Sequence, residues 1–273
     1  MSPLTNKLSK RLHILSFPLT YHLAPNITAF STERHASDPS APYDGFNVTH
    51  YSGDNPAHVA ACRTELCKQL GIDKQHLIIP RQIHGTKVAH VTNDNLDDSL
   101  DGVDALITNL PNTCIGISTA DCVPILLHDS RTQTIAAIHA GWRGTVARIA
   151  SHTLSDMNRI YGTCPSDVMA IIGPSIGPEA FEVGDEVYEA FAKAFFPIDV
   201  IAVKDSRFPH PERWHIDLWQ ANAWDLVQAG LSTENVSISG LCTHTHFARF
   251  FSARRLGINS GRMFTGIVRH EHI

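Results

Sequence analysis

The chain has 273 residues, of which 43% are hydrophobic and 18% are charged. This balance excludes an intrinsically disordered chain, which is poor in core-forming residues and rich in charge. The formal net charge of −5 gives no basic surplus, so we expect no nucleic-acid partner. No apolar run approaches the roughly 18–20 residues that cross a bilayer, and the N-terminal stretch lacks a signal-peptide core. We therefore expect a cytoplasmic protein with no membrane partner, whose six cysteines are thiols.

The first predicted elements are a surface loop and a helix. Residues 33–43 are rich in Ser, Pro, Asp and Ala, which is typical of a loop. A helix is predicted between Gly53 and Leu70, because Asp54 or Asn55 can cap it and small or apolar residues follow at helical spacing.

The rest of the chain alternates between strand-like and helical patterns. The predicted strands cover residues 77–80, 87–91, 105–108, 114–119, 123–128, 134–139, 168–173 and 236–241. The predicted helices cover residues 146–160, 184–195 and 215–230. These elements indicate the α/β (α+β) class, as a compact single-domain sandwich with a mixed β-sheet and flanking helices.

Three predicted strand ends carry reactive side chains, within residues 81–85, 119–122 and 139–144. Catalytic groups concentrate where rigid strands meet loops, and three such turns can converge on one edge of a sheet. His84, Cys122 and His139 would then form a set of two imidazoles and one thiol. Three such ligands with one open position describe a catalytic zinc site. The same residues also suit a nucleophilic Cys122 thiolate with a histidine as its base.

Two segments are candidates for binding the substrate. The turn that contains Arg143 is rich in glycine and precedes a helix, so Arg143 and the N–H groups of the turn can face a phosphate or carboxylate. Towards the C-terminus, Arg254 can bind an anion and Phe251 can stack on a ring.

Taken together and in this order, these motifs resemble the YfiH-like laccase-domain family. Its members are variously called multicopper polyphenol oxidase, peptidoglycan editing factor and purine nucleoside phosphorylase. The matching motifs are QIHG at 82–85, DALIT at 104–108, TADCVP at 119–124, HAGWRG at 139–144, IGPSIG at 172–177, FEV at 181–183, FFSARR at 250–255 and GRM at 261–263. The family's opening segment is altered, since residues 30–35 lack its paired glycines. Arg34 is therefore not assigned to the substrate.

The resemblance implies a sandwich-like catalytic domain over residues 28–264. We expect an N-terminal extension and first strand over 1–27 and a C-terminal tail over 265–273. The resemblance also implies a zinc ion, or less favourably copper, held by His84, Cys122 and His139. The implied reactions are phosphorolysis of adenosine, inosine, guanosine and methylthioadenosine, and deamination of adenosine. The partners would be a purine nucleoside and phosphate.

Further roles follow from this interpretation. Besides the three ligands, Asp121 is assigned to catalysis, as a proton carrier or as the partner that orients a metal-bound histidine. Substrate binding is assigned to five residues, namely Asn47, Gln82, Arg143, Phe251 and Arg254.

Three other functions stay open. A cysteine-type hydrolase that edits a peptidoglycan precursor would need Cys122 but no metal. A copper polyphenol oxidase needs a type 1 site and many further histidines, whereas this chain has only two H-x-H pairs. A binding module would close a structural zinc with a fourth ligand, for which Cys242, His244 and His246 are the candidates. No oligomeric state is predicted.

Overall fold

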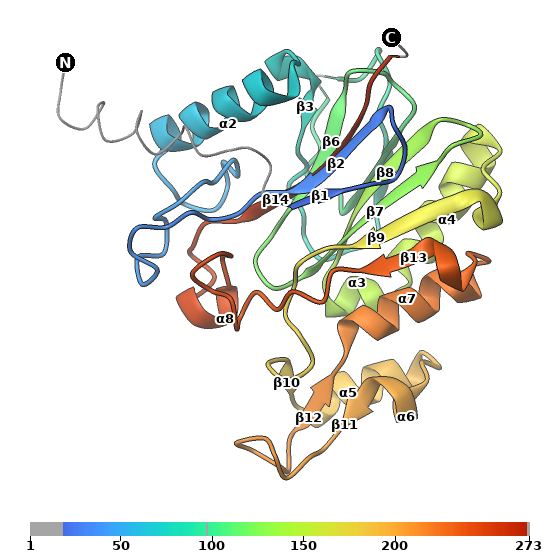
Figure 1. The fold of residues 1–273 in the computed structure, drawn as a ribbon. Helices are drawn as coiled ribbons and strands as arrows, with labels where there is room; N and C mark the ends of the chain where they lie inside the picture. Colours follow the sequence, from blue (N-terminus) through green and yellow to red (C-terminus); the bar gives the residue numbers. More distant parts are fainter. Residues whose placement is uncertain (1–18, 97, 272–273) are drawn as a thin grey trace.

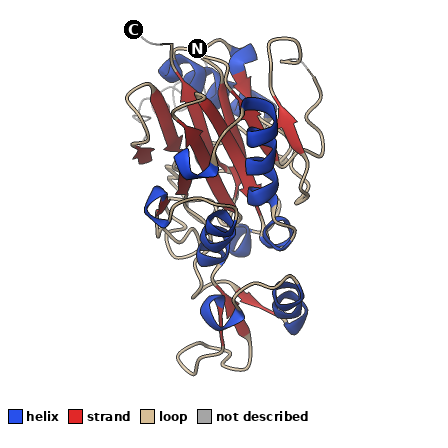
Figure 2. Cartoon of the chain, turned by 90° about the vertical axis from the view of Figure 1, so that its right-hand side faces the viewer, coloured by secondary structure: helices blue, strands red, loops and turns tan. Residues whose placement is uncertain are grey.

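Two β-sheets packed face to face form the centre of the molecule (Figures 1 and 2). The computed structural model describes residues 19–96 and 98–271. The five-stranded sheet has the order β1 (Leu19–Tyr21), β2 (Ile27–Ser31), β14 (Met263–Arg269), β6 (Cys114–Thr119) and β3 (Leu77–Ile78). The six-stranded sheet has the order β13 (Val236–Ile238), β9 (Val168–Ile172), β7 (Val123–Asp129), β8 (Thr134–Ala140), β5 (Ala105–Thr108) and β4 (Val88–His90).

Helices cover the outer face of each sheet, which gives four layers. On the five-stranded sheet lies α2 (Pro56–Leu70), which buries Cys62, Leu66 and Leu70 against the sheet. On the six-stranded sheet lie α4 (Ile149–Tyr161) and α7 (Leu218–Gln228). Strands alternate their side chains between two faces, so both sheets also share an apolar layer between them. The predicted sandwich with flanking helices is confirmed.

The remaining elements are short. A third sheet, with the order β10 (Glu182–Val183), β12 (Trp214–Ile216) and β11 (Ala202–Val203), lies with α5 (Asp185–Lys193) and α6 (Ile198–Ile201) at the bottom of Figure 1. The other short helices are η2 (Lys74–His76), α3 (Trp142–Val146), η3 (Pro165–Asp167), η4 (Thr233–Asn235) and α8 (Ala253–Leu256). Within the described residues, no helix is long and apolar enough to cross a bilayer.

Local chemistry explains three of the helix boundaries. Asn55 caps α2 by accepting a hydrogen bond from the Ala57 N–H at 2.9 Å. The predicted helix 215–230 starts only at Leu218, because Asp217 caps it through the Gln220 N–H at 3.0 Å. A separate short helix, α3, precedes α4, since Arg148 adopts a left-handed conformation with φ of 62° between them.

The C-terminal segment corrects one expectation. Residues 265–269 were expected to belong to a tail, but they form most of β14, which lies between β2 and β6. Antiparallel pairing joins Thr265 to Ser31 on one side and to Ile117 on the other. Because β14 is buried between two neighbouring strands, it is part of the core and not a tail. Of the segment 1–27, predicted as an extension and first strand, residues 1–18 lie outside the described residues, and β1 follows at Leu19–Tyr21.

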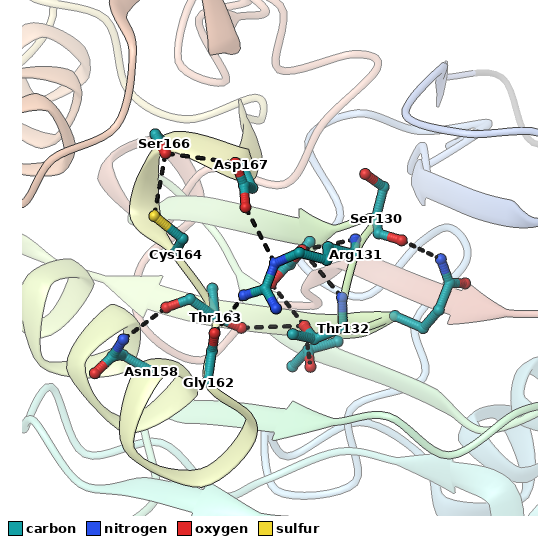
Figure 3. A network of polar contacts seen from close by, with 12 residues as sticks. Ser130, Arg131, Thr132, Asn158, Gly162, Thr163, Cys164, Ser166 and Asp167 are labelled. Carbon is teal, nitrogen blue, oxygen red and sulfur yellow. Dashed lines mark hydrogen bonds and ion pairs between the residues drawn. The ribbon is translucent and has the colours of Figure 1, made fainter.

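A polar network fixes the end of the β7–β8 hairpin that lies away from the reactive turns (Figure 3). Arg131 in the hairpin turn forms an ion pair with Asp167 at 3.2 Å and donates to the Gly162 carbonyl at the end of α4. Asn158 donates to the Thr163 carbonyl at 2.8 Å. The two contacts of Arg131 hold the hairpin turn to the end of α4 and to η3.

Candidate metal centre

Three turns meet at the other end of the β7–β8 hairpin. His84 follows β3, Cys122 lies between β6 and β7, and His139 is near the end of β8. One donor atom from each lies within 4.8 Å of the other two. The structure therefore brings the three predicted ligands together, although 38 and 17 residues separate them along the chain.

Unusual backbone conformations allow this convergence. His84 and Asp121 both have positive φ, at 65° and 87°, which is uncommon for residues other than glycine. Gly141 lies directly against the site, because a Cβ atom there would stand 2.9 Å from His84 Cδ2 and 3.1 Å from Cys122 Sγ. Any larger residue at position 141 would push the ligands apart.

Asp104 holds two of the three turns, a role that the sequence analysis did not assign to it. Its Oδ1 lies 2.8 Å from His139 Nδ1, and its two oxygens accept the N–H groups of Ile83, His84 and Gly85 at 2.8–3.2 Å. Burial alone would raise the pKa of Asp104, but its bonds to His139 and these N–H groups lower it. With Nδ1 engaged, His139 has Nε2 left for a metal.

The sequence placed Asp104 directly before a predicted strand, at the start of the DALIT motif. In the structure, Ala105 of β5 pairs with Ile138 of β8, so Asp104 stands opposite His139. That pairing depends on the order of strands in the sheet, which the sequence pattern did not reveal.

Charge and hydrogen bonding favour a thiolate at Cys122. Burial alone would raise its pKa, but the charge of His139 and hydrogen bonds to His139 and His84 lower it to about 6. Burial would lower the pKa of His139, yet Cys122 and Asp104 raise it to about 9. These opposite shifts favour a thiolate at Cys122 beside a protonated His139, and a cation that displaces the proton would meet three good donors.

The donor set fits zinc. Two imidazoles and a thiolate suit this ion, and three protein ligands leave one position for a substrate or water. Within the described residues, no fourth His, Cys, Asp or Glu joins the group. Cys242, a candidate fourth ligand, accepts the N–H groups of Gly177 and Thr245 at 3.2 and 3.4 Å.

Asp121 is adjacent to Cys122, but its carboxylate is directed to other partners. It accepts the Thr243 hydroxyl at 2.6 Å, the Ser252 hydroxyl at 3.0 Å and the Arg254 N–H at 2.7 Å. One role considered for Asp121 was the orientation of a histidine ligand, but the carboxylate that contacts His139 is that of Asp104. Asp121 instead joins two C-terminal segments to the Cys122 turn.

Two predicted substrate residues have their amides fully engaged by the protein. Asn47 is fully buried and bonds to Ser52, Asp54 and the N–H groups of Thr49 and Arg262. Gln82 bonds to the N–H and the carbonyl of Ser118 at 2.9 and 2.8 Å, like a neighbouring strand. Both residues therefore support the turns around the site.

The other three predicted substrate residues differ in exposure. Phe251 is fully buried, and the Arg34 guanidinium lies 4.8 Å from the centre of its ring. A nucleobase could therefore stack on Phe251 only after the side chains around it, including Arg34, have moved. Arg143 is exposed and stacks on Trp142 at 4.3 Å. Arg254 is exposed, and both its Nη atoms donate to the Glu182 carbonyl at 3.2 Å.

Comparisons with known proteins show the family of this chain. A family model described as "Multi-copper polyphenol oxidoreductase laccase" matches residues 28–270. A protein named purine nucleoside phosphorylase from Bacteroides thetaiotaomicron is 44% identical over 90% of this chain and 93% of its own length. A protein named adenosine deaminase RL5, from an unknown prokaryotic organism, is 46% identical over 89% of this chain and 94% of its own length.

Solved structures show the same fold. The crystal structure of Bacillus licheniformis hypothetical protein YfiH matches with a TM-score of 0.82 and 26% identity, covering 92% of this chain and 99% of that one. YlmD from Geobacillus stearothermophilus matches with a TM-score of 0.81 and 29% identity, covering 91% of this chain and 94% of that one.

Proposed function

Because this chain belongs to the YfiH-like multi-copper polyphenol oxidoreductase laccase family, we propose that it is a zinc-dependent purine nucleoside enzyme. It would cleave adenosine, inosine, guanosine and methylthioadenosine with phosphate, and it would deaminate adenosine. The names of two relatives support both activities. The observation that carries the proposal is the cluster of His84, Cys122 and His139 with no fourth protein ligand among the described residues.

Each residue of the site has a stated task in this proposal. His84, Cys122 and His139 hold the ion, and Asp104 fixes the ring of His139 through the 2.8 Å bond to Nδ1. When bound, zinc supplies Lewis acidity at its open position. Asp121 positions the Arg254 segment through the 2.7 Å bond from the Arg254 N–H. Because both of its oxygens already accept hydrogen bonds, this positioning role suits Asp121 better than proton transfer.

Copper oxidase chemistry has less support than zinc chemistry. A multicopper oxidase needs several copper sites, one of them a type 1 site with a Cys and two His ligands. In residues 19–96 and 98–271, one group of three or more metal-binding side chains is present. The single cluster favours one ion and no electron-transfer chain.

One observation favours a second candidate, the cysteine-type hydrolase. Cys122, His139 and Asp104 are linked in the order of a nucleophile, a base and an orienting carboxylate. The low pKa of Cys122, about 6, also suits a nucleophile. This candidate predicts an enzyme that stays active on a peptidoglycan precursor after its metal has been removed.

Product analysis with adenosine separates these functions. Zinc-loaded, chelator-treated and His84→Ala proteins are incubated with adenosine, with and without phosphate, and the products are separated by chromatography. From the zinc-loaded protein alone, we expect inosine in both conditions, and adenine and ribose 1-phosphate only when phosphate is present. No turnover by a protein with one zinc per chain would contradict the proposal, and activity on a peptidoglycan precursor after chelation would favour the hydrolase.

A further inference from the structure

Arg262 lies beside the metal centre, although the sequence analysis gave it no role. Met263, the first residue of β14, pairs with Thr119 at the end of β6. The antiparallel register therefore puts Arg262 opposite Ala120, next to the turn that carries Asp121 and Cys122. Its backbone N–H donates to Asn47 Oδ1 at 3.3 Å, so a buried side chain anchors this position.

The guanidinium of Arg262 is partly buried and has no acidic partner. It donates to the carbonyls of Ser260, Gly261 and Ile258 at 2.6–2.9 Å and to the Ser260 hydroxyl at 3.1 Å. Among the residues that the structure describes, it forms no ion pair, and its Nε–H takes part in none of these bonds. A guanidinium remains charged in proteins, so this one is a cation with a donor to spare.

Electrostatics agree with this placement. Burial lowers the pKa of Arg262, and the nearby groups of Tyr51, Cys122, Tyr43 and Asp121 act in the opposite direction. A partly buried cation without an ion-pair partner is costly. A ligand anion would supply such a partner when the ion and the substrate are in place.

The other arginines near the site each lack one of these properties. Arg34 is fully buried and donates to several carbonyls, among them those of Asp44 and Pro39. Arg143 is exposed and stacks on Trp142, and Arg254 is exposed and donates to the backbone carbonyl of Glu182. Arg262 combines partial burial, a place beside Cys122 and the absence of a carboxylate partner.

We propose that Arg262 binds the inorganic phosphate used in phosphorolysis, in place of Arg143. This proposal rests on the proposed function and names the residue of its phosphate subsite. In the reaction, an oxygen of dihydrogen phosphate forms a bond to C1′ of the ribose while the C1′–N9 bond breaks. The electron pair of that bond and one proton from the phosphate go to the purine. Arg262 holds the phosphate oxygens beside the metal centre.

The test compares Arg262→Gln and Arg262→Lys with Arg143→Gln, all as zinc-loaded full-length protein. Loss of a charge-assisted hydrogen bond should raise the KM for phosphate by about 10- to 100-fold in Arg262→Gln. Arg262→Lys keeps the positive charge, so its KM for phosphate should rise less than that of Arg262→Gln. Arg143→Gln should keep the wild-type KM. Deamination of adenosine needs no phosphate, so Arg262→Gln should slow phosphorolysis at low phosphate much more than it slows deamination.

A binding measurement separates the subsite from the proposed function. Calorimetry with inorganic phosphate alone should show binding to the wild type and to Arg262→Lys, and weak or no binding to Arg262→Gln. Phosphate binding that depends on Arg262 without nucleoside turnover would overturn the function and leave the subsite standing. Phosphorolysis with an unchanged phosphate KM in Arg262→Gln would overturn the subsite alone. Melting temperature and zinc content confirm that each variant is folded and loaded.

Discussion

Asp104 Oδ1 lies 2.8 Å from His139 Nδ1, and the same carboxylate accepts the N–H of His84 at 2.9 Å. One buried side chain thereby holds both histidine ligands of the candidate metal centre. The link arises because β5 and β8 are neighbours in the six-stranded sheet. The metal affinity of this protein should therefore depend on a residue that does not touch the ion.

Asp104→Asn should weaken zinc binding by about 10- to 100-fold, as the loss of such an orienting carboxylate does in other zinc sites. The amide removes the negative charge and cannot accept every N–H group that the carboxylate accepts. Competition with a chromogenic chelator measures the change in Kd. Asp101→Asn is the matched control, because Asp101 is exposed on the same segment and should keep the wild-type Kd. Equal Kd values for Asp104→Asn and the wild type would contradict this assignment.

Gly141→Ala should raise the Kd for zinc by about tenfold or more. The new Cβ would stand 2.9 Å from His84 Cδ2 and 3.1 Å from Cys122 Sγ, so the ligands must separate. Metal analysis of dialysed protein measures the loss. Gly162→Ala is the control, because it strains a residue with φ of 70° but has no atom within 4 Å of its Cβ. Gly162→Ala should lower the melting temperature but keep its zinc. Full zinc retention by Gly141→Ala would refute the steric argument.

The grouping of His84, Cys122 and His139 could be predicted from the sequence, and the residues that support the group could not. The resemblance to a known family singled out these three residues, and the structure places their donor atoms close together. Asp104 and β14 depend on which strands are neighbours, and that order follows from long-range packing. Phe251 was expected to stack on a ligand, but it is fully buried and the Arg34 guanidinium lies over its ring. Sequence patterns do not show which aromatic residues are covered by other side chains, so this burial could not be predicted.

Asn47→Ala should lower the free energy of unfolding by about 2–4 kcal/mol. The change removes a fully buried amide and leaves the N–H groups of Thr49 and Arg262 without their acceptor. Urea denaturation measures the loss. Asn235→Ala, which removes one exposed bond to the Ser166 carbonyl, should cost less than about 1 kcal/mol. A stable Asn47→Ala protein with a raised KM for the nucleoside would instead support the substrate-binding role.

Protonation of His128 should destabilise the fold below pH 6.5. The residue is 1% exposed, and neither ring nitrogen has a hydrogen-bond partner among the described residues. Burial and the charge of Arg269 lower its pKa, while Asp129 raises it. An unfolded histidine titrates near about 6.5, so the unfolded state binds more protons as the pH falls from there. His128 therefore does not reduce the free energy of unfolding above this pH. Below it, the free energy of unfolding falls by at most about 1.4 kcal/mol per pH unit.

Urea denaturation at pH 7.5 and 5.5 measures this effect. His128→Leu should reduce the loss of stability between the two pH values. His152→Leu changes an exposed histidine of α4. This variant should lose as much stability between the two pH values as the wild type does. The same pH dependence in His128→Leu and the wild type would show that other groups cause it.

Zinc titration of the metal-free protein, followed by adenosine consumption in phosphate buffer, tests the central claim most directly. We expect activity to rise in proportion to added zinc and to level off at one ion per chain, with His84→Ala and Cys122→Ser remaining at background. A metal-free protein as active as the zinc-loaded one, or a His84→Ala variant with full activity, would contradict a metal centre formed by His84, Cys122 and His139.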